Sequence, residues 1–86
     1  MPTVALVFLR DAQKQMALIP AVDRRRLVER LTAIAAEPAA RHPGTTQLVN
    51  RAETWRVRQG DWRAIYRIVG ADVVVIRAGH RREVYG

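Results

Sequence analysis

The twelve residues from Trp55 to Tyr66, W-R-V-R-Q-G-D-W-R-A-I-Y, constrain the fold more than any other stretch of the chain. Arginine alternates with aromatic and aliphatic residues on both sides of Gln59-Gly60-Asp61, which has the composition of a tight turn. Successive side chains of a strand point to opposite faces, so the pattern predicts a β-hairpin with one apolar face and one guanidinium-rich face.

Burying arginines would cost far more free energy than burying tryptophans, and this difference indicates which face of the hairpin is inside. We therefore expect the arginines to line an exposed face that binds anions. The residues expected to point inward are Trp55, Val57, Trp62, Ala64, Tyr66 and Ile68.

Composition limits the chemistry. The 86 residues are enough for one small domain, residues 1–86, and contain neither cysteine nor serine. Two histidines without closely spaced carboxylates do not predict a metal site. The sequence contains no glycine-rich phosphate-binding loop, so we expect no cofactor. Fourteen arginines, one lysine and a net charge of +7 favour a polyanionic partner such as RNA, DNA or an acidic protein.

No segment approaches the ~20 apolar residues that cross a bilayer, and no secretory signal pattern opens the chain. We therefore expect a cytoplasmic protein with no membrane partner.

The first half of the chain predicts one strand and two helices. Residues 2–9 are apolar and β-branched without polar alternation, which predicts a strand that is central or covered on both faces. Helical spacing of apolar residues follows over 11–19 and 21–37, and Pro20 separates the two helices into an αα-hairpin. The R-R-R run at 24–26 fits a solvated helix face, with contact to ribosomal RNA as the alternative.

The second half of the chain predicts strands. Residues 38–52 fit an extended connection with a turn at Pro43-Gly44, and the arginine hairpin follows. Residues 73–78 predict a nearly apolar strand, and residues 80–85 a short last strand or extended tail. The order β-α-α-β-β-β-β predicts an α+β fold, with the helices on one face of a mainly antiparallel sheet of four to five strands.

This order resembles the RelE/ParE superfamily of type II toxin–antitoxin toxins. Two motifs carry the likeness, W-R-V-R-x-G-D-W-R-A-I-Y-R-I and the closing A-G-H-R-R-E-V-Y, and together they extend it over essentially the full length. The ending is more similar to the RelE-like branch of ribosome-dependent messenger RNA interferases. That resemblance implies a RelE-like fold and cleavage of mRNA in the ribosomal A site. It also implies a hetero-oligomer with a small acidic or amphipathic antitoxin.

Carried over to this sequence, the resemblance implies that Arg56, Arg58, Arg63, Arg81 and Tyr85 bind and cleave RNA. Metal-independent cleavage needs a base for the 2′-hydroxyl, charge stabilisation at phosphorus and an acid for the leaving oxygen. Guanidinium groups suit the second task, because they are permanently charged and grip phosphate through two hydrogen bonds.

The base is less clear from the sequence. Family members often carry lysine where this chain has Arg56 and Arg58, and a guanidinium is a poor base. Tyr85 is one candidate, although it could instead stack on an exposed RNA base. His80 is another candidate, although a lone histidine beside a turn is more often a polar turn residue. Glu83 is a weaker third candidate, because a salt bridge to Arg81 or Arg82 is the more common fate of such a side chain.

Two other functions fit the same residues. A ParE-like inhibitor of DNA gyrase would use the arginines to bind a protein target instead of cutting RNA. A degenerate, non-catalytic binding module would explain why the sequence offers no obvious base.

Overall fold

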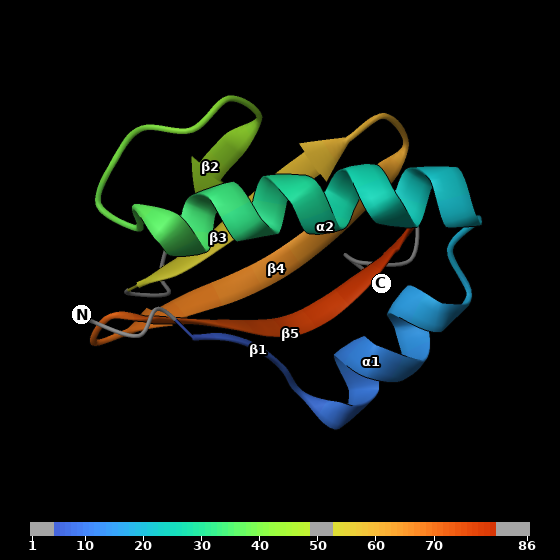
Figure 1. The fold of residues 1–86 in the computed structure, drawn as a ribbon, viewed down its shortest axis with the longest axis horizontal. Helices are drawn as coiled ribbons and strands as arrows, with labels where there is room; N and C mark the ends of the chain where they lie inside the picture. Colours follow the sequence, from blue (N-terminus) through green and yellow to red (C-terminus); the bar gives the residue numbers. More distant parts are fainter. Residues whose placement is uncertain (1–4, 49–52, 81–86) are drawn as a thin grey trace.

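The structure is a computed structural model that describes residues 5–48 and 53–80. The elements are β1 (Leu6–Phe8), α1 (Arg10–Ala17), α2 (Ala21–Ala36), β2 (Thr45–Gln47), β3 (Thr54–Gln59), β4 (Trp62–Val69) and β5 (Asp72–His80). They form two layers, with α2 crossing one face of a five-stranded sheet and α1 beside β5 (Figure 1). The strand order is β1-β5-β4-β3-β2, and every pairing is antiparallel except β1 with β5. The predicted α+β class and mainly antiparallel sheet are confirmed.

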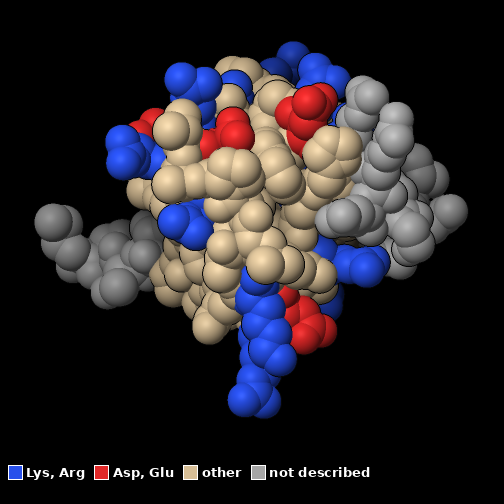
Figure 2. All heavy atoms as spheres, turned by 90° about the vertical axis from the view of Figure 1, so that its right-hand side faces the viewer, with Lys and Arg blue, Asp and Glu red and all other residues tan. Residues whose placement is uncertain are grey.

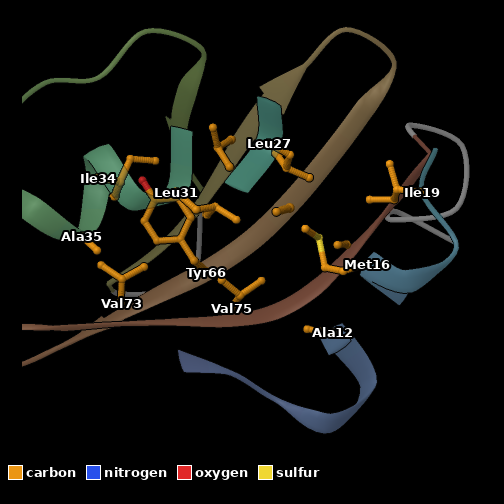
Figure 3. Packing of buried hydrophobic residues seen from close by; sticks show 13 residues of the cluster. Ala12, Met16, Ile19, Leu27, Leu31, Ile34, Ala35, Tyr66, Val73 and Val75 are labelled. Atoms are coloured by element: carbon orange, nitrogen blue, oxygen red, sulfur yellow. The ribbon is translucent and has the colours of Figure 1, made fainter. Parts of the chain in front are cut away.

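The helices supply one side of the hydrophobic core. Pro20 precedes α2 with φ −52°, which suits a helix entrance, and Asp23 in the first turn complements the helix dipole. Leu27, Leu31 and Ile34 of α2 are at most 1% exposed, and in Figure 3 they face the sheet residues Tyr66, Val73 and Val75. Burying each such aliphatic side chain contributes about 1.5–3 kcal/mol. Both helices agree with their predicted ranges to within two residues.

The β3–β4 hairpin has the predicted alternation. Trp55 lies opposite Tyr66 and Val57 opposite Ala64, and the latter two side chains are fully buried beneath the helices. Gly60 occupies the connecting turn with φ +61°, a left-handed conformation that glycine adopts without steric cost. The arginines of the hairpin therefore lie on the face of the sheet that the helices leave open.

The prediction for the first strand was wrong in its position. Instead of lying centrally, β1 is an edge strand that pairs with β5 alone. Its apolar run packs Leu6 and Phe8 against the core, while Val7 and the following Leu9 are 40% and 45% exposed. A continuous apolar run therefore marked a strand with only one covered face.

The connection at 38–52 also contains a strand that the sequence did not predict. Thr45–Gln47 forms β2, which pairs antiparallel with β3 and places Thr46 opposite Arg56. A segment of three polar residues is too short to show the alternation of apolar and polar side chains that marks a strand. Of the predicted last strand at 80–85, His80 ends β5, and residues 81–85 lie outside the described residues.

A β-bulge in β5 shifts its alternation by one residue. Tyr66 of β4 pairs with Val75, but the preceding Ile65 pairs with Arg77, so Ile76 is an extra residue on β5. Before the bulge Val73 and Val75 face the helices, and after it Ala78 does. Arg77 consequently shares the open face with the hairpin arginines. Simple alternation would have placed it beside Val73 and Val75.

Within the ranges 5–48 and 53–80, no helix is both long and apolar enough to cross a membrane.

Candidate functional site

Five arginines from three neighbouring strands share the open face of the sheet, and we call this surface the arginine face. Its members are Arg56 and Arg58 of β3, Arg63 and Arg67 of β4, and Arg77 of β5. Arg58 and Arg63 are direct cross-strand partners, so two like charges lie opposite each other. Along these three strands the only carboxylate is Asp72, at the first residue of β5. The positive charge of the arginine face is therefore not balanced within the strands that carry it.

Ile65 occupies the centre of the arginine face. Its cross-strand partners are Arg56 and Arg77, and its same-face neighbours along β4 are Arg63 and Arg67. Although it lies outside the core cluster beneath the helices, it is only 5% exposed. An anion held beside this apolar centre would be partly withdrawn from water, where its attraction to a guanidinium is stronger than in bulk solvent.

The five guanidinium groups differ in their surroundings. Arg56 and Arg63 are half-buried with buried Nε atoms, and Arg56 Nη2 donates a long hydrogen bond of 3.5 Å to Thr46 Oγ1. Arg58, Arg67 and Arg77 are exposed, and their side chains form no hydrogen bond or ion pair with the residues the structure describes. Two of the five guanidinium groups are thus partly enclosed by the protein, and the other three are exposed to a ligand.

Hydrogen bonds from the turn before β2 and from α2 position the end of β3 that carries Arg58. The Arg58 backbone N–H donates to the carbonyl oxygen of Gly44 at 3.0 Å, and a Cβ on Gly44 would lie 3.0 Å from the Arg58 carbonyl oxygen. Arg30 of α2 donates to the Pro43 carbonyl oxygen at 3.1 Å and to the side-chain oxygen of Gln59. Arg30 therefore ties α2 to the turn before β2 and to the end of β3.

The R-R-R run belongs to the opposite side of the molecule. Arg25 and Arg26 are exposed on α2, and Arg24 Nη1 donates to the Ala17 carbonyl oxygen at 3.4 Å. Since α2 lies on the helix side of the sheet, these charges do not contribute to the arginine face. Figure 2 views the end of the molecule next to the α1–α2 connection, where neutral side chains fill the centre and charged ones lie around it.

His80 lies on the other face of the sheet from the arginines. It pairs with Trp62 on the helix side, and the two rings meet edge to face with centroids 5.5 Å apart and an interplanar angle of 89°. The structure thus brings Arg56, Arg58 and Arg63 together, but it does not bring His80 to them. Arg81 and Tyr85 lie outside the described residues.

The arginine face includes two residues that the sequence-based site left out, Arg67 and Arg77. Arg67 alternates with Arg63 in the sequence, and that signal could have found it. Arg77 had no such signal, because its position depends on the bulge at Ile76.

A cavity lies on the helix side of the sheet. It has a volume of about 1100 Å³, with Trp55, Tyr66 and Ile68 of the sheet on one side and the 38–43 loop on another. Burial raises the pKa of Tyr66 to about 12, so its hydroxyl stays protonated at physiological pH. Within the described ranges no three histidine, aspartate or glutamate side chains lie close enough to hold a metal ion.

Comparison with known proteins gives a consistent result. A family model described as the ParE toxin of the type II toxin–antitoxin system parDE matches residues 6–85. The toxin–antitoxin complex RelBE2 from Mycobacterium tuberculosis contains a chain with 25% sequence identity and a TM-score of 0.74, and the match covers 93% of this chain and 100% of that one. No curated protein sequence is similar enough to count as a match.

Two more distant structures show the same fold. The isolated Escherichia coli RelE toxin is 21% identical with a TM-score of 0.78, over 96% of this chain and 92% of that one. A chain of the E. coli DinJ–YafQ toxin–antitoxin complex is 14% identical with a TM-score of 0.79, over 98% of this chain and 100% of that one.

Proposed function

The chain belongs to the ParE toxin family of type II toxin–antitoxin systems, and we propose that this toxin inhibits translation by cutting messenger RNA on its arginine face. One observation carries the proposal: Arg58 and Arg63 lie directly opposite each other on an exposed sheet face without a carboxylate between them. Like charges in direct cross-strand positions destabilise a sheet. A phosphate diester bound by both guanidinium groups would offset that cost.

The proposed reaction is transesterification at one phosphate of the message. The 2′-hydroxyl gives its proton to a base, and its oxygen attacks the adjacent phosphorus. The bond from phosphorus to the 5′-oxygen breaks, and the leaving oxygen takes a proton from water. The products are a 2′,3′-cyclic phosphate and a 5′-hydroxyl. Arg58 and Arg63 hold the non-bridging oxygens, and they stabilise the extra negative charge that develops there. Arg56 approaches from the next same-face position of β3 and adds a third positive charge.

The proton transfers require groups other than the arginines. On β3 to β5 the arginine face carries arginine, isoleucine, threonine, valine and glycine, and Asp72 opposite Val69 at its far end. Asp72 lies three same-face positions away from the row of Arg58 and Arg63, and within these strands the face has no histidine, tyrosine or lysine. We assign the base to Tyr85 and a further phosphate contact to Arg81, on the resemblance of the closing motif. His80 is not assigned a role, since its ring contacts Trp62 on the other face.

The proposal includes the partners of the reaction. The substrate is mRNA in the ribosomal A site, so the activity would be cytoplasmic, and no cofactor is required. A small acidic or amphipathic antitoxin would neutralise the toxin in a hetero-oligomer. The net charge of +7 favours both an RNA substrate and an acidic inhibitor.

Inhibition of DNA gyrase is the second candidate function, because the matching family model describes a ParE toxin. In that case the arginine face would bind the gyrase–DNA complex without catalysis. A supercoiling assay separates the two functions, since only a gyrase poison accumulates cleaved DNA complexes.

The proposed function is tested with ribosomes translating a defined message, followed by primer extension. The expected result is a set of discrete cuts in the translated region, which the cognate antitoxin abolishes and which Arg58→Gln with Arg63→Gln reduces by about 100-fold or more. The matched control is Arg25→Gln with Arg26→Gln, which removes the same charge from α2. Growth arrest with intact transcripts would refute the proposal.

A further inference from the structure

Arg67 and Arg77 extend the arginine face beyond the residues that hold the scissile phosphate. We propose that they form a second phosphate subsite, which binds the backbone of a nucleotide next to the cleaved linkage. This inference rests on the proposed function, because the subsite is defined by its position next to the scissile phosphate. Together the two subsites would give the RNA a direction across the sheet.

The register of the sheet spaces the arginines in three successive rows. Arg58 and Arg63 form the first row, Arg56 and Arg77 flank Ile65 in the second, and Arg67 lies in the third. Same-face positions repeat every two residues, roughly 7 Å along a strand, so the rows extend over about 14 Å. A charged surface with such a repeat suits the backbone of an extended single strand, where each nucleotide carries one phosphate.

Both guanidinium groups are available for that contact. Arg67 and Arg77 are exposed and form no hydrogen bond or ion pair with the residues in the described ranges. The cross-strand partners of Arg67 are Thr54 and Val74, and that of Arg77 is Ile65. None of these direct partners carries a charge. Asp72, the diagonal neighbour of Arg67 on the same face, forms no ion pair with it.

The bulge at Ile76 turns Arg77 toward this surface. Without the extra residue, alternation would direct Arg77 toward the helix side of the sheet. The Gln15 side chain of α1 accepts a hydrogen bond of 2.8 Å from the backbone N–H of Ala78, two residues after the bulge, and so ties this part of β5 to the helix layer. Bulges commonly re-aim a side chain near a functional site.

A groove beside Arg77 extends the proposed RNA-binding surface toward α1. It has a volume of about 470 Å³ and is lined by Leu9, Arg10, Asp11, Gln15, Ile76 and Arg77. Two arginines against one aspartate keep its charge positive, and Asp11 forms no ion pair with Arg77. The groove gives the nucleic acid a route off the sheet at its α1 end.

The surface fits RNA better than an acidic peptide. An extended peptide would need apolar pockets for alternate side chains. The apolar centre of the arginine face is Ile65, which is only 5% exposed and offers almost no contact area, and Val69, 53% exposed on the same face of β4, lies at the end of the strand. A phosphate backbone needs cations alone, and the surface supplies five.

The test uses the full chain and a single-stranded RNA oligonucleotide that carries 2′-O-methyl groups throughout and therefore cannot be cleaved. Its Kd is measured by fluorescence anisotropy at several salt concentrations. Arg67→Gln with Arg77→Gln is expected to weaken binding at least tenfold and to lower the slope of log K against log salt by about 1.4, or ~0.7 for each lost phosphate contact. The control, Arg25→Gln with Arg26→Gln, is expected to change Kd less than threefold.

Equal losses in the two double variants would overturn the subsite, because a general charge effect would explain them. A glutamate decamer that binds as tightly as the RNA and loses the same affinity in the Arg67–Arg77 variant would also overturn it, in favour of an acidic protein ligand. If the double variant does not fold, the single variants carry the same test, each with a slope change of about 0.7.

Failure of the subsite is distinguishable from failure of the proposed function. A toxin that binds the methylated RNA through Arg67 and Arg77 but leaves ribosome-bound message intact refutes cleavage and supports the subsite. A toxin that cuts the message, while its Arg67–Arg77 variant binds like the control, refutes the subsite alone.

Discussion

Ile65 and Tyr66 are consecutive residues of β4 that belong to two different environments. Ile65 lies among four arginines on the open face, and Tyr66 lies in the core beneath α2, 2% exposed. The helix face of the sheet gains free energy by burying apolar side chains, whereas the arginine face holds like charges close together. The alternation of a strand therefore keeps the requirements of stability and of ligand binding separate along one short hairpin.

The largest effect should come from the helix face. Leu31→Ala removes a fully buried side chain of α2, so we expect the free energy of unfolding to fall by about 2–5 kcal/mol in urea denaturation. The control is Leu18→Ala, which changes a side chain that is 83% exposed and should alter that free energy by less than ~0.5 kcal/mol. Similar losses of unfolding free energy in both variants would show that Leu31 is not more buried than Leu18.

The opposite result is expected on the arginine face. Arg58→Gln with Arg63→Gln should reduce message cleavage by about 100-fold or more while the free energy of unfolding stays the same or rises by up to ~1 kcal/mol, because a like-charge pair is removed. Cleavage assays and urea denaturation on the same preparation measure both quantities. A loss of more than ~1 kcal/mol would mean that these arginines stabilise the fold, against the separation of the two faces.

Gly44 contacts the backbone of the arginine face, because its carbonyl oxygen accepts a hydrogen bond from the Arg58 N–H. Gly44→Ala should cost about 2 kcal/mol, since it combines φ +75° with a Cβ 3.0 Å from the Arg58 carbonyl oxygen. Gly60→Ala is the matched variant, with φ +61° but no atom within 4 Å of the new Cβ, and it should cost about half as much. Equal values of the unfolding free energy would show that the contact with Arg58 contributes nothing.

The smallest effect concerns the pH dependence of the helix face. Burial raises the pKa of Tyr66 from 10.0 to about 12, so the folded chain holds this proton more tightly than the unfolded chain. Its contribution is complete below pH 10 and is lost as pH rises toward 12, by about 1 kcal/mol near pH 11. Tyr66→Phe should remove that part of the pH dependence in urea denaturation. Parallel pH profiles for the parent and the variant would contradict the burial of the hydroxyl.

Much of the fold could be predicted from the sequence, because strong periodicities act over long elements. The alternation from Trp55 to Ile68 correctly predicts both faces of the hairpin, and helical spacing with Pro20 predicts both helices. β2 is three residues long and has no measurable period. The central position predicted for β1 failed because an apolar run does not show how many faces of a strand are covered.

The candidate site was predictable only where the alternation is regular. Arg56, Arg58 and Arg63 share a face as the hairpin pattern predicts. The same pattern does not extend through β5, where one extra residue moves Arg77 onto the arginine face and His80 onto the helix face. Register shifts of this kind depend on backbone pairing, which residue types do not reveal. The assignments of Arg81 and Tyr85 stay predictions.

The bulge at Ile76 also determines how β5 tolerates change. Before it, the positions that require small or apolar residues are the odd-numbered Val73 and Val75, and after it they are even-numbered, beginning at Ala78. A one-residue deletion near Ile76 would therefore exchange inward and outward side chains over one part of the strand, which no single substitution can do. In related chains of different length, we expect insertions and deletions to fall in the turns. We expect the number of residues between the inward-facing positions before and after the bulge to stay the same.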